Sequence, residues 1–172
     1  RGRRRWLPGG LPAAAAKLRP LAFAILGTVS VIYTIPTLAM FGLMIPILGL
    51  GFWPAVTAIV LYSLLPVVQN AYTGIVNVPE HSREAARGLG MSAWQMLWRV
   101  ELPLSLVVLS AGVRTAVVNA VGMGTLASLI GAGGLGDLVF RGISTVSLVV
   151  VLAGSIPIVV LAVLADMGLR SE

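Results

Sequence analysis

The sequence predicts an all-α integral membrane protein with about four transmembrane helices. Of its 172 residues, 58% are hydrophobic and 10% are charged. The mean hydropathy of +0.98 is too high for a soluble domain of this length. No charged side chain occurs between Leu21 and Pro79, and because a helix crosses a bilayer with about 20 apolar residues, this run crosses at least twice. Apolar runs recur along the whole chain, which a secretory signal peptide does not explain.

The first two spans are expected over residues 20–48 and 54–72. Pro36 lies inside the first span, and since a proline removes an internal helix hydrogen bond, we expect a kink just before it. Gly49-Leu50-Gly51 supplies the turn between the two spans, and Trp53 beside it suits a position at the membrane interface.

The polar loop that follows is predicted to form two short helices. Asn77 is a residue type that caps helix N-termini, and Gly90 can take the positive φ of a sharp reversal after the first helix. Ser92 and Gln95 have the spacing of a capping box at the start of the second helix. We expect that helix to stop before Pro103, because the residue ahead of a proline disfavours helical geometry.

The third and fourth spans are expected over residues 104–130 and 146–165, so that both chain ends lie on one side of the membrane. Nine of the twelve basic residues fall on that same side, in a basic tail over residues 1–19 and in the polar loop. These are Arg1, Arg3, Arg4, Arg5, Lys17, Arg19, Arg83, Arg87 and Arg99. This distribution predicts that the tail, the loop and both termini are cytoplasmic. Because no basic patch is interleaved with aromatic residues on a soluble element, nucleic-acid binding is disfavoured.

One motif in the polar loop is a spaced pattern. Glu84-Ala85-Ala86 is followed after three residues by Gly90, and after nine more by Val100, a free position and Leu102-Pro103. The pattern resembles the EAA loop of ABC-transporter permeases. The resemblance implies a MetI-like permease core in which a cytoplasmic coupling loop, here residues 77–103, docks on a separate ATP-hydrolysing subunit. The coupling residues that it implies are Glu84, Ala85, Ala86, Arg87, Gly90, Leu102 and Pro103.

Flanking sequence is similar to the osmoprotectant branch of these importers, which take up glycine betaine, choline or carnitine. The segments that carry this likeness are AYTGIVNVPEHSREAARGLGMSAWQMLWRVELPLS, AGVRTAVV and LIGAGGLGDLVFRGI. The resemblance implies an ABC ATPase subunit, a second permease subunit in a homo- or heterodimer, and an extracytoplasmic substrate-binding protein, in a bacterial or archaeal inner membrane. Because members of the branch carry one more span ahead of the first one here, we expect an N-terminal span to be missing.

Two alternatives stay open. The GAGGLGD segment also points to the methionine-like group, so an importer of methionine or another small amino-acid-like solute is one alternative. The other is a channel without an ATPase partner, which a well-formed coupling loop disfavours. An integral-membrane enzyme is disfavoured because the sequence has no clustered metal ligands and no Ser-His-Asp set. The only lysine, Lys17, follows no phosphate-binding glycine loop, so we expect no bound cofactor or metal and no ATP hydrolysis by this chain.

The segment GAGGLG after the third span also matches the dinucleotide motif G-x-G-x-x-G. That motif requires a strand before it and a helix after it in a βαβ unit, whereas here it follows a membrane span. We interpret it as an extracytoplasmic reentrant turn that faces the binding protein, formed by Gly131, Gly133, Gly134, Gly136 and Asp137. Asp137 and Arg141 have the i, i+4 spacing of a helical ion pair.

Arg114 is the one charge that lies well inside a predicted span. It follows Pro103 by about 16 Å of helix, and a charge in hydrocarbon costs about 3 kcal/mol on insertion scales. We therefore expect Arg114 to line the translocation path or a subunit interface, together with Asn119 five positions further on. The alternative is that its long side chain reaches the cytoplasmic interface.

Overall fold

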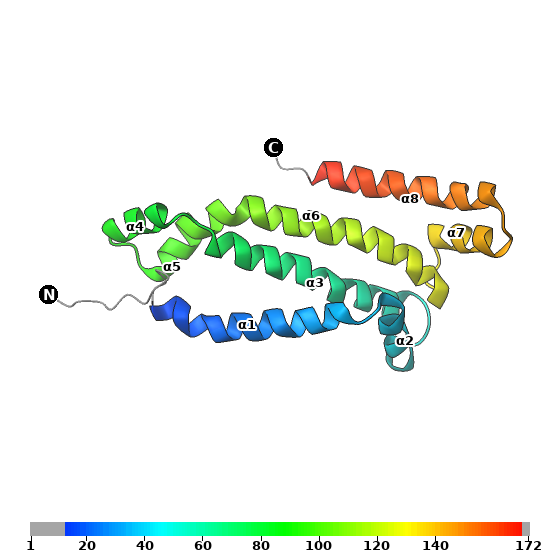
Figure 1. Ribbon diagram of the computed structural model, residues 1–172, viewed down its shortest axis with the longest axis horizontal. Coiled ribbons are helices and arrows are strands. Elements are labelled where there is room, and N and C mark those ends of the chain that lie inside the picture. The colour runs from blue at the N-terminus through cyan, green and yellow to red at the C-terminus, as the bar shows by residue number, and fades with distance from the viewer. Residues whose placement is uncertain (1–12, 170–172) are drawn as a thin grey trace.

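The computed structural model describes residues 13–169, with side chains described from Ala24 onward, and this part of the chain is helical. Side chains of the expected basic tail, residues 1–19, therefore lie outside the description. In chain order the elements are α1 (Ala13–Thr34), α2 (Thr37–Leu48), α3 (Phe52–Val76), α4 (Glu80–Gly88), α5 (Ala93–Met96), a π-helical turn η1 (Leu97–Glu101), α6 (Leu102–Ala127), a 3-10 turn η2 (Ser128–Ile130), α7 (Leu135–Ser144) and α8 (Leu148–Gly168). Figure 1 shows their arrangement.

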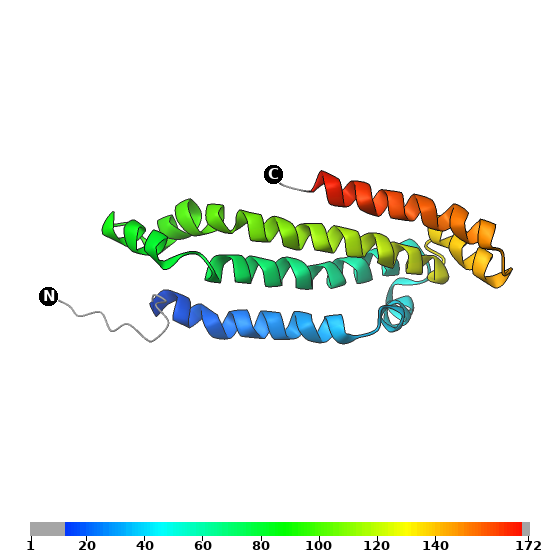
Figure 2. The same cartoon turned by 45° about the horizontal axis from the view of Figure 1, so that its top comes forward.

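An antiparallel pair, α3 and α6, forms the centre of the bundle. The two helices approach closely because glycines leave room: a Cβ atom at Gly112 would lie 2.6 Å from the Cβ atom of Asn70 and 2.7 Å from the carbonyl oxygen of Pro66. Nearer the polar loop, a Cβ atom at Gly74 would lie 3.0 Å from that of Ser105. Figure 2 shows α1 running beside α3, and α8 beside α6.

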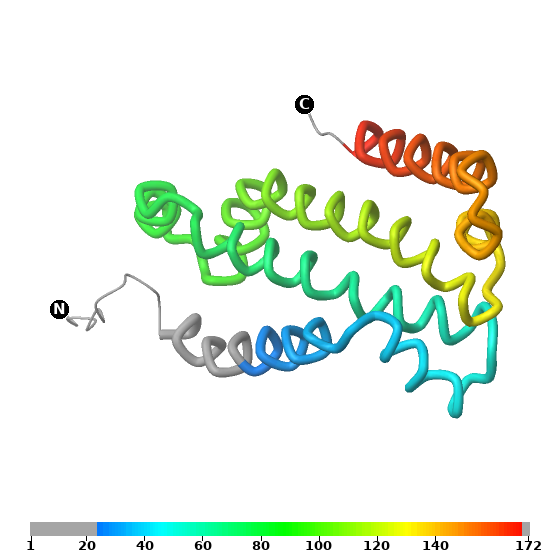
Figure 3. The backbone as a smooth tube through the Cα atoms, turned by 45° about the vertical axis from the view of Figure 1, so that its right-hand side comes forward, coloured from blue at the N-terminus to red at the C-terminus, as the bar shows by residue number. Residues whose placement is uncertain are grey.

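The two ends of the bundle differ. The helices α4 and α5 lie at one end, while α2 and α7 lie at the opposite end (Figure 3). Three continuous helical stretches are long and apolar enough to cross a membrane, and the α1–α2 pair makes a fourth span if its two bent halves are counted as one. The predicted all-α fold with about four spans is thus confirmed.

The first span is broken, whereas the sequence predicts one kinked helix over residues 20–48. Helix α1 ends at Thr34, and α2 restarts after Pro36 at an angle of 96° to it. Pro36 has no N–H to continue the helical ladder. The break leaves the carbonyl of Ile35 available, and the hydroxyl of Tyr62 on α3 donates a hydrogen bond to it. Because α3 supplies this partner, the chain tolerates a full break at the proline.

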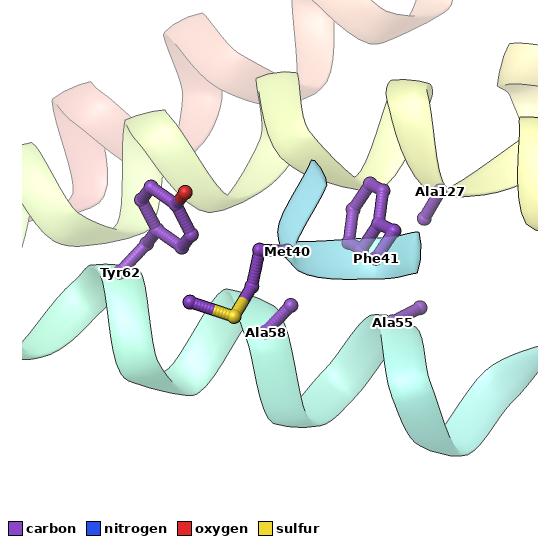
Figure 4. Packing of buried hydrophobic residues seen from close by; sticks show 6 residues of the cluster. All are labelled: Met40, Phe41, Ala55, Ala58, Tyr62 and Ala127. Carbon is purple, nitrogen blue, oxygen red and sulfur yellow. The ribbon is translucent and has the colours of Figure 1, made fainter. Parts of the chain in front are cut away.

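The principal core holds α2 against α3 and the end of α6 (Figure 4). Phe41 of α2 is fully buried, and Met40 beside it is 3% exposed. Alanines of α3 line the opposing surface, so α2 can lie close to the α3 backbone. The buried members of this cluster are Met40, Phe41, Ala55, Ala58, Tyr62 and Ala127. It fixes α2 across the end of the bundle that is remote from the polar loop.

The start of α4 differs from the prediction. Asn77 is the residue that terminates α3, and Pro79 occupies the N-cap position of α4. The predicted capping box of α5 is confirmed: the Ser92 hydroxyl accepts a hydrogen bond from the Gln95 backbone N–H at 3.3 Å, and the Gln95 side chain accepts one from the Ser92 N–H at 2.9 Å.

The second loop helix does not stop before Pro103, as the sequence predicts. It continues from Ala93 to Ile130 through the π-helical turn η1. Within this turn the N–H of Leu102 donates to the carbonyl of Leu97, five residues back. The wider turn changes the hydrogen-bond register immediately ahead of the proline, which lacks a donor of its own, and so the helix passes through it.

Candidate functional site

Helix α4 carries the expected coupling residues on different faces. Glu84 and Ala85 are exposed, whereas Ala86 is only 2% exposed. Successive residues of an α-helix lie about 100° apart around its axis. On α4, Ala85 therefore faces outward and Ala86 packs inward.

Arg87 is held along the surface of α4. Its guanidinium donates a hydrogen bond to the Glu80 carboxylate at 2.8 Å, and Glu80 also lies 3.7 Å from the guanidinium of Arg83. The side chain of Glu80 is 45% exposed. Exposed pairs of this kind contribute about 1 kcal/mol or less, so this pair orients the Arg87 side chain more than it stabilises the fold.

Gly90 ends α4 in the predicted conformation, with φ of +74°. The N–H of Met91 donates to the carbonyl of Ala86 at 3.1 Å, and the N–H of Gly90 donates to that of Arg87 at 2.9 Å. These two bonds form a Schellman motif with Gly90 at the left-handed position. No atom lies within 4 Å of a Cβ atom placed on Gly90. Backbone conformation, and not lack of space, thus requires a glycine here.

Leu102 and Pro103 occupy the first turn of α6, after η1. Leu102 is partly buried and Pro103 is exposed. The structure therefore distributes the motif over two elements, with its first half on α4 and its last two residues on α6. Contacts of Arg83, a residue outside the predicted set, join α4 to α3 and to η1, which continues into α6.

Arg83 is buried, with 5% exposure. Its Nε donates to Glu101 at 2.8 Å, and its Nη2 donates to the carbonyl of Ile75 at 2.5 Å. A signal for it exists in the sequence: Arg83 and Ala86 are spaced i, i+3 and share one face of α4. Interpreting that face as the one that packs on the bundle would have identified Arg83 as a buried contact residue.

Arg114 and Asn119 are both carried by α6. Both line an open hollow of about 300 Å³ on α6 and α8, with Ala111, Thr115, Val118 and Asp166. The guanidinium of Arg114 donates from Nε and Nη2 to the two carboxylate oxygens of Asp166. The partner of the intramembrane charge is thus a residue of the last helix.

The sequence does not predict Asp166 as the partner of Arg114, because the fourth span is expected to end at residue 165. Helix α8 instead continues to Gly168. A signal was present here as well. The chain has only six acidic residues, and a charge inside a membrane span needs a partner. An acidic residue at the end of another predicted span was the natural candidate.

The far-side segment forms a turn followed by a helix. Gly131, Gly133 and Gly134 have φ of +81°, +75° and +97°, and α7 then packs against α8. A Cβ atom at Gly136 would lie 2.2 Å from the carbonyl oxygen of Thr125, so a glycine is required there for close packing. Asp137 is exposed in the first turn of α7.

The expected pair between Asp137 and Arg141 is not formed: the ion pairs among residues 24–169 do not join these two side chains. Both side chains are exposed. Solvent weakens such a pair enough that side-chain entropy can keep it apart.

These features define a class of protein. A helical membrane core with a two-helix polar loop, built on the EAA spacing and closed by a left-handed Gly90, is that of a transport permease. The chain belongs to the family of binding-protein-dependent transport system inner membrane components, whose sequence profile matches residues 7–170. It is a multi-pass membrane protein and a permease subunit of an ABC importer.

Two relatives show the range of similarity. The chain is 47% identical over 151 residues to the osmoprotectant import permease protein OsmW of Salmonella typhimurium, covering 85% of this chain and 70% of that protein. It is 38% identical over 156 residues to the glycine betaine/carnitine/choline transport system permease protein OpuCB of Bacillus subtilis, covering 91% and 72%. Among solved structures, an inward-facing form of the MetNI methionine ABC transporter matches with a TM-score of 0.74 and 25% identity, covering 94% of this chain and 77% of that one.

Proposed function

We propose that this permease imports quaternary-amine osmoprotectants such as glycine betaine or choline. Support comes from the relatives whose names state such substrates, at 38% and 47% identity over most of the chain. Identity to the methionine transporter is 25%. Import of methionine or a similar solute is therefore the weaker alternative, although its fold is shared.

The loop between α3 and α6 is proposed to dock on an ABC ATPase subunit, which hydrolyses ATP for the complex. The observation that supports this best is the ordered α4 at the end of the bundle, with Glu84 and Ala85 exposed and its C-terminus fixed by Gly90. A small residue on the exposed face allows a partner surface to approach closely. The same end is proposed to be cytoplasmic, because Arg83, Arg87 and Arg99 lie there.

The opposite end of the bundle is proposed to receive substrate from an extracytoplasmic binding protein. Helix α7 lies there (Figure 1), preceded by the turn of Gly131, Gly133 and Gly134 and with Asp137 exposed in its first turn. The apolar outer surface of α8, where Gly154 is the buried residue, is available to lipid and to a second permease subunit.

Arg114 and Asn119 are proposed to lie on the translocation path or on the interface with the second permease. Both line the open hollow between α6 and α8. The ion pair with Asp166 reduces the cost of keeping a cationic side chain at this depth, and the hollow gives it access to water or to a partner. The snorkelling alternative explains neither the bidentate pair nor the hollow.

Uptake by the assembled importer tests the substrate proposal. The permease, its ATPase and its binding protein are reconstituted in proteoliposomes, and uptake of radiolabelled glycine betaine, choline and methionine is measured with and without ATP. We expect ATP-dependent uptake of a quaternary amine that excess methionine does not inhibit. ATP-dependent uptake of methionine alone would support the alternative, and flux without ATP would indicate a channel.

A further inference from the structure

Arg83 contacts three helical segments in and next to the polar loop. It is carried by α4, it donates to the Ile75 carbonyl in the last turn of α3 at 2.5 Å, and it donates to Glu101 at the end of η1 at 2.8 Å. Because η1 continues directly into α6, this single side chain ties α4 to both helices of the central pair.

The chemistry of these contacts requires arginine. A guanidinium is planar and directs its donors in fixed directions, so one group can serve the carboxylate and the carbonyl together. Both partners are suited to a cation, because one is a carboxylate and the other lies at the negative C-terminal end of α3. The side chains of Arg83 and Glu101 are 6% and 13% exposed, so water screens their attraction little.

Burial also separates Arg83 from the docking face. Its neighbours Glu84 and Ala85 are exposed, while Arg83 is 5% exposed and directed into the bundle. It therefore has little surface to offer an ATPase. Its contacts with Ile75 and Glu101 lie where α4 meets the ends of α3 and η1.

We propose that Arg83 is a positioning residue that makes α4 and the adjoining ends of α3 and α6 move as one body. A displacement of α4 by the ATPase then reaches the central pair directly, without being absorbed by the peptide links around Val78 and Leu89. The packing of α3 on α6 at Gly112 carries the displacement further along both helices. This inference rests on the proposed docking of α4 on an ATPase.

The test compares Arg83→Met with Arg99→Met in the reconstituted complex. Both changes remove one positive charge from the loop, but Arg99 is exposed on η1. Three quantities are measured on the same samples. They are the amount of ATPase that co-purifies with the permease, the rate of ATP hydrolysis and the rate of uptake. We expect the Arg83→Met permease to retain the bound ATPase. Uptake per ATP hydrolysed should fall by roughly fivefold or more, because methionine cannot donate the two hydrogen bonds of the guanidinium. Arg99→Met should keep the wild-type ratio.

Two milder variants keep the test decisive if Arg83→Met assembles poorly. Arg83→Lys keeps the positive charge but loses the planar guanidinium. Glu101→Gln keeps a hydrogen-bond acceptor but loses the negative charge. Both should assemble and show an intermediate ratio of uptake to hydrolysis. A merely structural role would change the amount of complex but leave that ratio at the wild-type value, which would overturn the proposal.

A distance measurement gives an independent readout. The chain contains no cysteine, so spin labels can be placed at His81→Cys on α4 and Thr73→Cys on α3, both exposed positions. We expect a narrow distance distribution in the parent and a broad one in Arg83→Met. An equally narrow distribution would contradict the proposal, as would loss of ATPase binding in a variant whose α4 stays in place. If the parent complex itself does not couple uptake to ATP, the proposed docking fails, which is a distinct result.

Discussion

Arg114 of α6 and Asp166 of α8 form a two-pronged ion pair between two membrane-spanning helices. The side chains are 33% and 32% exposed, so the pair is neither fully buried nor freely solvated. Removing only the arginine would take from Asp166 the two hydrogen bonds that the guanidinium donates across the two helices. The two charges must therefore be considered together in any account of how this chain inserts and folds.

A double-mutant cycle tests this dependence. We expect Arg114→Leu and Asp166→Leu each to lower the yield of folded complex, because each breaks the ion pair between α6 and α8 while the other charge remains. The double variant should recover much of that yield. At one-third exposure the coupling energy should be about 1 kcal/mol, measured from thermal unfolding in detergent. Strictly additive losses would show that the pair contributes nothing.

Uptake by Arg114→Lys separates the pair geometry from the charge. Lysine keeps a cation but cannot form the two parallel hydrogen bonds, so we expect uptake between that of the parent and that of Arg114→Leu. The measurement is initial uptake per folded complex. Full activity of both variants would leave Arg114 without a role in transport.

Substitutions at Gly90 test the end of the coupling helix. Gly90→Val should abolish uptake while insertion remains normal, because a β-branched residue resists the positive φ observed here. Gly90→Asn is the matched control: asparagine tolerates this conformation, and the structure leaves space for its side chain. Normal uptake in Gly90→Val would disprove the need for the left-handed turn.

Two glycines of α6 test the packing of the central pair. We expect Gly112→Ala to destabilise the protein by about 1–3 kcal/mol, because its methyl group would meet Asn70 and the Pro66 carbonyl. Gly122→Ala should be neutral or stabilising by up to about 1 kcal/mol, since no atom lies within 4 Å of its Cβ position. Fluorescence-detected thermal unfolding in detergent compares the two, and equal melting temperatures would contradict the packing described.

Features that depend on residues close together in the chain could be predicted from the sequence. The Ser92 capping box depends on two residues three apart, and the Gly90 turn depends on the absence of a Cβ atom. The apolar runs likewise determine the fold class, since a bilayer admits backbone mainly as helix.

Features that depend on a partner far along the chain could not be predicted. Whether Pro36 kinks or breaks its helix depends on the Tyr62 hydroxyl on another helix. The π turn before Pro103, and the inward position of Ala86, depend on how the loop packs on the bundle. Arg83 and Glu101 lie 18 positions apart, and Arg114 and Asp166 lie 52 apart. Sequence spacing alone assigns no such pairs.

Crosslinking at two neighbouring alanines tests most directly the claim that α4 is the cytoplasmic docking element. Because the chain has no cysteine, Ala85→Cys and Ala86→Cys can each be introduced alone. We expect Ala85→Cys to crosslink to the ATPase subunit and to resist an impermeant thiol reagent added outside intact cells, while the buried Ala86→Cys crosslinks weakly if at all. Labelling of Ala85→Cys from outside, or crosslinking of Ala86→Cys alone, would contradict the account.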